Sequence, residues 1–194
     1  MRIDHVIYAT QDLDAAAGRV ESELGLAAIT GGRHEDHGTH NMIVPLGGGY
    51  LELMAVADPE EASGSPIGGA LQARLADQGD GLFAWAIEVE DVDRVADRLG
   101  LPVTTIAREG LTARLVGVAE ALPNPLLPFL IERDEGILDP GGEGDAGGIT
   151  WVEVAGDREA LERRLGGADL PVKVVEGPSG VRAMGIGDRE LRNR

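Results

Sequence analysis

The sequence contains no cysteine. Disulfides, thiolate metal sites and cysteine nucleophiles are therefore excluded, and any metal site must use His, Asp or Glu side chains. Aromatic residues make up only 3% of the chain, so the core must be built from Leu, Val, Ile and Ala. The chain has no run of about 18 apolar residues, and its first residues resemble a strand rather than a leader segment. We therefore expect no membrane partner and a cytoplasmic location.

Positive charge is also scarce, since 17 Lys and Arg residues face 34 Asp and Glu residues and the formal net charge is −17. Such a charge repels nucleic-acid phosphates and anionic membrane surfaces, so we expect no nucleic-acid partner. The 194 residues, 43% of them hydrophobic and 26% charged, suit one packed domain or two small modules that share a core.

The chain repeats a pattern of alternating apolar strands and amphipathic helices, which predicts an α+β fold. Two βαβββ modules and a third, partial βαββ repeat align on three aspartates placed to cap helices, Asp12, Asp91 and Asp157. The expected segments are a first module (1–57), a connection with one short helix (58–81), a second module (82–133), a Gly/Asp-rich linker (134–148), the third repeat (149–187) and a charged tail (188–194).

His5 lies in an apolar, β-branched stretch, 3–9, that predicts a strand. Because side chains alternate along a strand, Ile3, His5 and Ile7 should share one face, with Asp4 and Val6 on the other. An imidazole among apolar neighbours suits a metal ligand, a general base or a hydrogen-bonded structural histidine. His5 lies seven residues before Asp12, and the equivalent positions in the other copies are Ala84 and Thr150, so the imidazole occurs only once.

Glu52 interrupts another predicted strand, 50–56, in which Leu51, Leu53 and Ala55 form the buried face. Glu52 must then face either solvent or a cavity. The remaining histidines, His34, His37 and His40, follow a His-x-x-His-x-x-His spacing. The glycines around them predict a loop rather than a helix, and such a loop presents one or two of these side chains to a pocket.

Several short motifs resemble, in their order and spacing, the glyoxalase-like branch of the vicinal oxygen chelate superfamily. They lie at residues 3–9, 12–13, 31–34, 38–41, 50–53 and 127–132. The resemblance implies paired βαβββ modules whose mixed sheet curls into a cup, with helices outside. It also implies a small-molecule ligand in the cup and allows a homodimer.

In this superfamily a divalent metal is held by a histidine of the first strand and a glutamate of the fourth strand of each module. By position, the resemblance implies His5 and Glu52 from the first module, and Ala84 and Glu132 from the second. Ala84 cannot bind a metal, which argues against a full four-ligand site. His40 is a further candidate ligand, in a set of two histidines and one carboxylate. Neutral imidazole and carboxylate suit Mn, Fe, Ni, Zn or Mg.

The resemblance also implies roles in catalysis and substrate binding. A carboxylate beside the metal can shuttle a proton, which makes Glu52 the candidate catalytic residue. The candidate substrate-binding residues are His34, His37, Thr39 and Asn41.

These residues suggest a metal-dependent lyase, isomerase or dioxygenase acting on a small oxygen-rich substrate. A metal-free binding or sequestering protein that uses the same cup is the alternative, and Ala84 favours it. A third interpretation is a structural role in a homodimer without chemistry.

Overall fold

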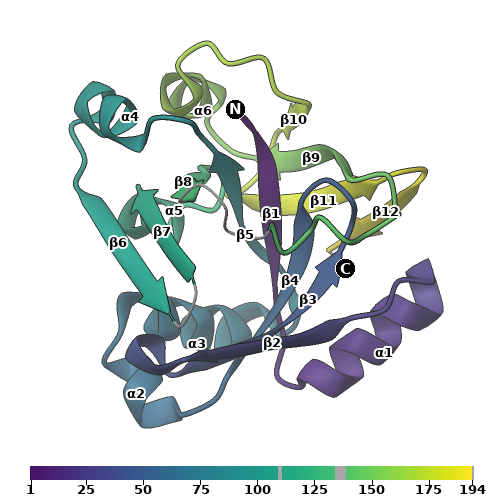
Figure 1. Ribbon diagram of the computed structural model, residues 1–194. Helices are drawn as coiled ribbons and strands as arrows, with labels where there is room; N and C mark the ends of the chain where they lie inside the picture. The colour runs from purple at the N-terminus through teal and green to yellow at the C-terminus, as the bar shows by residue number, and fades with distance from the viewer. Residues whose placement is uncertain (109–110, 134–138, 194) are drawn as a thin grey trace.

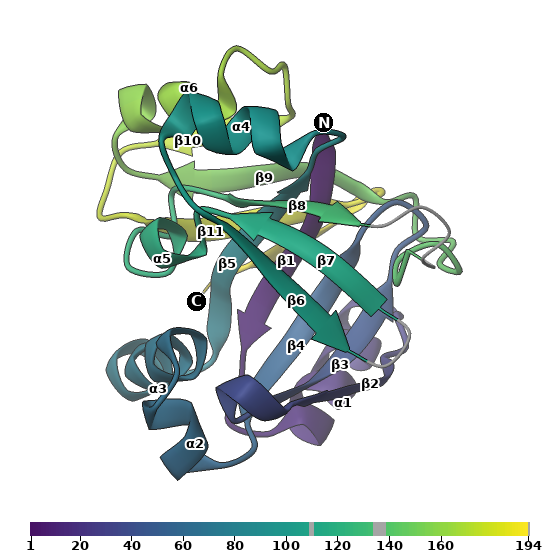
Figure 2. The same cartoon turned by 60° about the vertical axis from the view of Figure 1, so that its left-hand side comes forward.

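The computed structural model describes residues 1–108, 111–133 and 139–193, and within these ranges the chain forms two β-sheets (Figure 1). The larger sheet has eight strands in the order β2-β3-β4-β1-β5-β8-β7-β6, and the smaller has four in the order β10-β9-β11-β12. The larger sheet curls so that β6 and β7 lie opposite β2 and β3 (Figure 2). The fold is therefore the expected α+β class with a cup-like mixed sheet.

The elements follow the order expected from the repeats. The first part of the chain comprises β1 (Arg2–Ala9), α1 (Leu13–Leu24), β2 (Ile29–His34), the 3-10 helix η1 (Glu35–His37), β3 (Thr39–Pro45) and β4 (Tyr50–Val56). The middle part comprises α2 (Pro59–Ser63), α3 (Pro66–Gln78), β5 (Gly81–Glu88), α4 (Val92–Leu99), β6 (Val103–Arg108), β7 (Leu111–Val116), α5 (Val118–Ala121) and β8 (Phe129–Arg133). The last part comprises β9 (Ile149–Ala155), α6 (Arg158–Leu165), β10 (Val172–Val175), β11 (Gly180–Ile186) and β12 (Arg189–Arg192).

The three capping aspartates are confirmed. Asp12 accepts a hydrogen bond from the backbone N–H of Ala15, and Asp91 and Asp157 cap α4 and α6 in the same way. Each cap satisfies a backbone donor that the first turn of a helix leaves without a partner. Each of these helices also ends at a glycine in the left-handed conformation, where a side chain would be strained.

The two central strands join the halves of the larger sheet. β1 pairs with β4 in parallel and with β5 in antiparallel orientation, and β5 pairs with β8 in parallel. Side chains of β4, β1, β5 and β8 therefore alternate between the inner, concave face of the curled sheet and its outer face. This arrangement brings residues from the beginning and the middle of the chain together on one concave surface.

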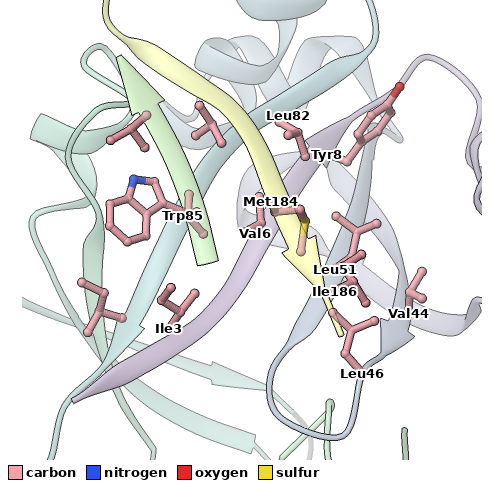
Figure 3. Packing of buried hydrophobic residues seen from close by; sticks show 14 of the residues in the cluster. Ile3, Val6, Tyr8, Val44, Leu46, Leu51, Leu82, Trp85, Met184 and Ile186 are labelled. Atoms are coloured by element: carbon pink, nitrogen blue, oxygen red, sulfur yellow. The ribbon is translucent and has the colours of Figure 1, made fainter. Parts of the chain in front are cut away.

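Two apolar clusters pack on the two faces of this sheet. On the outer face, the smaller sheet covers the central strands, with Met184 of β11 beside Val6 and Ile186 near Leu51 (Figure 3). Trp85 of β5 belongs to the same cluster. Helices α1 and α4 complete this outer cluster. On the inner face, Ile7 and Phe129 belong to a second cluster that also includes residues of α3 and α5.

Several elements differ from the expectations. The connection 58–81 contains two helices, α2 and α3, because both Asp58 and Ser65 cap a helix that begins with proline. Gly31, Gly32 and His34 lie in β2 and His37 in η1, where a loop was expected, and the charged tail contributes β12, paired with β11. Residues 134–138 of the expected linker lie outside the described residues. Among the described helices, none combines the length and the apolar character needed to span a membrane.

Candidate functional site

A bulge in β1 determines how His5 is presented. Ile3 pairs with Ile87 and His5 pairs with the adjacent Ala86, so Asp4 is an extra residue in the ladder. Strict alternation fails at this point, and the expected faces are corrected. Ile3 belongs to the outer cluster, whereas Asp4 contacts His5, with 2.5 Å between Asp4 Oδ2 and His5 Nδ1.

The imidazole of His5 is held on three sides. Asp4 binds Nδ1 at its edge, and the ring stacks on Tyr50 with 4.6 Å between ring centroids and an interplanar angle of 15°. The ring of Phe129 meets it edge-on at 5.4 Å. His5 is buried, so these contacts leave the ring one orientation.

Arg133, at the end of β8, binds both Asp4 and Tyr50. Its two Nη atoms donate to the two carboxylate oxygens of Asp4, and Nη2 also lies 3.2 Å from the Tyr50 hydroxyl. Asp4 is fully buried and only 7% of the Arg133 side chain is exposed, so this is an interior ion pair. Bidentate geometry of this kind is the strongest that an arginine and a carboxylate form.

The ionised state of this pair follows from its contacts. Burial alone would raise the pKa of Asp4, but hydrogen bonds from His5 and Arg133 outweigh burial and hold the pKa below its ordinary value. Burial likewise opposes the charge on Arg133, yet the hydrogen bond with Asp4 raises the pKa of Arg133 above its ordinary value. Burial and the nearby Asp4 and Glu52 raise the pKa of Tyr50, so its hydroxyl stays protonated at neutral pH.

Glu52 lies on the inner face of β4, beside Ile7 of β1. Its Oε1 accepts a hydrogen bond of 2.6 Å from Asn41 Nδ2, and its Oε2 lies 3.7 Å from His5 Nε2. The second distance exceeds that of a hydrogen bond. Only 6% of Glu52 is exposed, so of the two orientations left open by the sequence, solvent or cavity, the structure shows the inward one.

Asn41 of β3 is itself fixed by a glycine pair. Its Oδ1 accepts a hydrogen bond of 2.7 Å from the backbone N–H of Gly32. A Cβ atom at Gly31 would lie 2.0 Å from the same Oδ1, so the close approach requires glycine there. The Asn41 amide therefore has one orientation, with its Nδ2 directed at Glu52.

His34 lies on the other side of Glu52. Its Nε2 is 3.9 Å from Glu52 Oε1, and its Nδ1 is 2.8 Å from the hydroxyl of Thr39. The structure thus brings three of the four expected substrate-binding residues, His34, Thr39 and Asn41, together with Glu52 and His5. All of these side chains are buried.

Three other expected residues do not join this group. His37 Nδ1 lies 2.9 Å from Ser65 Oγ, at the start of α3. His40 pairs with Ala55 and so lies on the face of β4 opposite to Glu52. Glu132 accepts a hydrogen bond of 2.6 Å from the backbone N–H of Val92 at the start of α4. The structure corrects the expectation that His40 and Glu132 share a site with His5.

The register of β8 explains the correction for Glu132. Phe129 and Ile131 belong to the inner cluster, so Arg133 follows them on the inner face and Glu132 faces outward. In the first module Glu52 pairs with Ile7, which lies two positions after His5. In the second module Phe129 pairs with Ala86, which lies two positions after Ala84. The structural counterpart of Glu52 is therefore Phe129.

The second module consequently offers Ala84 and Phe129 where the first offers His5 and Glu52, and neither can bind a metal. Within residues 1–108, 111–133 and 139–193, no group of three or more His, Asp or Glu side chains is arranged to hold one ion. Oε1 of Glu52 is engaged by Asn41. The contact between His5 Nδ1 and Asp4 argues neither for nor against a metal, because a histidine that binds a metal through Nε2 commonly makes such a contact too. This donor set does not fit a divalent metal centre built from three or four side chains.

Three residues of the site were missed at the level of the sequence: Asp4, Tyr50 and Arg133. A carboxylate directly before a histidine in an otherwise apolar strand was a signal for Asp4, but strict alternation placed it on the wrong face. Arg133 could have been found from the period of two in Phe129, Ile131 and Arg133, had the register of β8 been known.

Comparison with known proteins places these observations in a family. A family model described as "Glyoxalase-like domain" matches residues 3–167. A 98-residue stretch is 33% identical to an ethylmalonyl-CoA/methylmalonyl-CoA epimerase of Cereibacter sphaeroides and covers 50% of this chain and 68% of that protein.

Solved structures share the fold at low identity. A hypothetical protein from Staphylococcus aureus superposes with a TM-score of 0.70 and 16% identity, over 93% of this chain and 88% of that one. A Streptomyces coelicolor methylmalonyl-CoA epimerase variant in complex with 2-nitronate-propionyl-CoA has a TM-score of 0.54 and 22% identity, over 68% of this chain and 96% of that one.

Proposed function

Because the chain belongs to the glyoxalase-like domain family, we propose that it is an isomerase-type enzyme that moves a proton at a carbon atom next to a carbonyl group. Glu52 is the acid–base residue of this proposal. The observation that supports it most directly is the buried carboxylate of Glu52. Asn41 binds its Oε1, and its Oε2 faces His5.

The chemistry follows from the two oxygens of Glu52. Oε1 is held by Asn41, so Oε2 takes the proton when the carbon–hydrogen bond breaks, and the electron pair moves to the carbonyl oxygen as an enolate. Return of the proton to carbon completes an epimerisation or isomerisation without an oxidant or reductant. Holding the carboxylate in one position lowers the barrier, because little has to reorganise before the proton moves.

The two halves of the concave face indicate the class of substrate. The half that contains His5, Glu52 and Asn41 is polar, and the half that contains Ala84 and Phe129 is apolar. Arg133 is already paired with Asp4, so a substrate carboxylate beside Glu52 would meet repulsion without a compensating cation. We therefore expect a small molecule with a neutral, oxygen-rich carbonyl end and a short apolar part.

A metal-free binding protein is the second candidate, and Ala84 and Phe129 favour it. They give the concave face an apolar wall of the kind that lines small-molecule sites. In this alternative Glu52 and Asn41 orient the ligand by hydrogen bonds, and no carbon–hydrogen bond of the ligand is broken. The enzyme and the binding protein would bind the same class of ligand, but only the enzyme would convert it into a product.

Solvent deuterium exchange separates them. The purified protein is incubated in D2O with acetoin or dihydroxyacetone as neutral probes, and with methylmalonyl-CoA because the names of the relatives mention it. Deuterium at the carbon next to the carbonyl is followed by NMR. We expect exchange above the buffer rate for at least one of the two neutral probes, and a loss of about 100-fold or more in Glu52→Gln, the usual scale of general base catalysis. Exchange with methylmalonyl-CoA alone would contradict the expectation of a neutral substrate.

Glu60→Gln is the matched control, since Glu60 is exposed on α2 and lies outside the site. It should exchange at the rate of the unmodified protein. Equal rates in Glu52→Gln and Glu60→Gln would refute the role of Glu52. Binding of a probe without exchange above the buffer rate would overturn the enzyme in favour of the binding protein.

A further inference from the structure

The second module contributes to the site in a way that the metal-binding pattern does not suggest. Its counterparts of His5 and Glu52 are Ala84 and Phe129, which carry no polar atom in the side chain. Yet Arg133, also from the second module, reaches 129 positions back in sequence to bind Asp4. The strands of both modules are joined through β1 and β5, which brings β8 close to β1.

We propose that Arg133 and Asp4 are positioning residues that set the orientation and the tautomer of His5. This inference rests on the proposed function for its consequence in catalysis, but its physical basis is separate. The relevant contacts are the bidentate pair between Arg133 and Asp4, the hydrogen bond between Asp4 and His5, and the stacking of Tyr50 on His5.

The tautomer follows from the hydrogen-bonding capacity of each group. An ionised carboxylate only accepts hydrogen bonds, so His5 must carry a hydrogen on Nδ1 to bind Asp4. Nε2 is then the nitrogen that faces Glu52, at 3.7 Å from Oε2. The alternative tautomer would place a lone pair of Nδ1 against a carboxylate oxygen 2.5 Å away, which is repulsive.

Arg133 makes this arrangement possible because it satisfies both oxygens of a fully buried carboxylate. An isolated carboxylate in an apolar interior becomes protonated rather than remaining charged. A protonated Asp4 could donate its O–H to Nδ1 of the Nε2–H tautomer or accept through its carbonyl oxygen from the Nδ1–H tautomer, so it would no longer select one of them. Arg133 also anchors the Tyr50 hydroxyl at 3.2 Å, and Tyr50 in turn covers one face of His5. One guanidinium therefore fixes the imidazole both at its edge and on its face.

The test is the tautomer of His5, read from the side-chain nitrogen shifts in long-range proton–nitrogen NMR spectra. The chain has four histidines, and the His5 signals are identified by their loss in His5→Gln. In the unmodified protein we expect a protonated Nδ1. In Arg133→Met and in Asp4→Asn we expect loss of the single Nδ1–H form and a mixture of tautomers.

Arg133→Lys keeps the charge but not the bidentate geometry, so it should give a spectrum between those of the unmodified protein and Arg133→Met. It also serves as the second variant if Arg133→Met fails to fold. Arg114→Met is the matched control. Arg114 lies on β7, next to β8, and it also pairs with carboxylates, those of Asp93 and Glu132, but not with Asp4. It should leave the His5 signals unchanged.

Two outcomes overturn the inference. One is an unmodified protein in which His5 carries its hydrogen on Nε2 alone. The other is a folded Arg133 variant, either Met or Lys, with the spectrum of the unmodified protein. The measurement needs no substrate, so failure of the deuterium exchange experiment leaves it intact. Conversely, Glu52→Gln should lower exchange by about 100-fold or more and preserve the Nδ1–H signal of His5, which separates positioning from proton transfer.

Discussion

Asp4 links the site to the stability of the protein at the scale of a single residue. Its folded pKa is held below the ordinary value of 3.8, so its contribution to stability is present above that value and is lost as pH falls further. At neutral pH, Asp4→Asn removes the carboxylate that binds both Nη atoms of the buried Arg133 and leaves only the more distant Glu88, with Oε1 3.7 Å from Nη1. Breaking a buried pair in this way costs about 3–5 kcal/mol.

We therefore expect Asp4→Asn to lower the free energy of unfolding strongly at pH 7. The difference from the unmodified protein should shrink as the pH falls below about 4, because Asp4 of the unfolded chain takes up a proton there while Asp4 of the folded chain keeps its charge. Urea unfolding at several pH values measures both effects. Asp36→Asn, at an exposed position in η1, is the control and should change little at any pH. A pH-independent difference between Asp4→Asn and the unmodified protein would contradict the lowered pKa.

The donor set around His5 gives a second prediction at this scale. Ala84 and Phe129 leave His5 and Glu52 without metal-binding partners at the equivalent positions of the second module, and the described part of the chain contains no three side chains placed to bind one divalent ion. Dialysis against EDTA should leave the thermal midpoint and the deuterium exchange rate unchanged. Elemental analysis should find far less than one Mn, Fe, Ni, Zn or Mg per chain. One tightly held ion per chain that His5→Ala removes would show that the donor set has been misjudged.

At the scale of elements, Glu132 distinguishes the register of β8 in the structure from the one expected from the resemblance. In the structure it accepts the backbone N–H of Val92 and so caps the start of α4. Glu132→Ala should lower the free energy of unfolding by about 0.5–2 kcal/mol, the usual cost of a lost helix cap. Deuterium exchange should stay within about two-fold, because the side chain lies on the outer face. A loss comparable to that of Glu52→Gln would instead place Glu132 in the site.

The same elements show what sequence patterns can and cannot predict. Capping aspartates and terminal glycines act locally, so the helices at Asp12, Asp91 and Asp157 were found correctly. The face on which a strand residue lies depends on the pairing of distant strands, and one extra residue reverses it. That is why Asp4 was placed on the wrong face and Glu132 was expected in the site.

Contacts between distant residues account for the rest of the site. Glu52 and His5 could be singled out because they are polar residues in apolar strands. The Gly31–Gly32 pair, by contrast, predicted a loop, and only the structure shows that these glycines let β2 approach Asn41. The spacing of His34, His37 and His40 does not show which of them enters the site. The structure places His34 beside Glu52, His37 beside Ser65 and His40 on the opposite face of the sheet.

At the scale of the whole molecule, the third repeat covers the outer face of the strands that carry the site. Val6 and Trp85 are fully buried in the same apolar cluster as Met184 and Ile186 of the smaller sheet. His5 and Val6 are neighbours on β1, so packing on the outer face holds the backbone that presents the imidazole on the inner face. The site therefore depends on residues from all three repeats, although its polar side chains come from the first two.

Shared packing of this kind predicts that the two sheets unfold together. The chain has two tryptophans, Trp85 in the larger sheet and Trp151 in the smaller, so Trp85→Phe and Trp151→Phe each leave one sheet with a fluorescent reporter. The urea midpoint reported by each variant should match the midpoint of its own circular dichroism signal, as expected for a cooperative transition.

Met184→Ala, which removes a buried side chain between the sheets, should lower the free energy of unfolding by about 2–5 kcal/mol and shift both reporters equally. Val175→Ala, at a position 37% exposed, is the control and should shift neither by more than about 0.5 kcal/mol. An earlier transition seen by Trp151 alone would show instead that the third repeat unfolds as a separate unit.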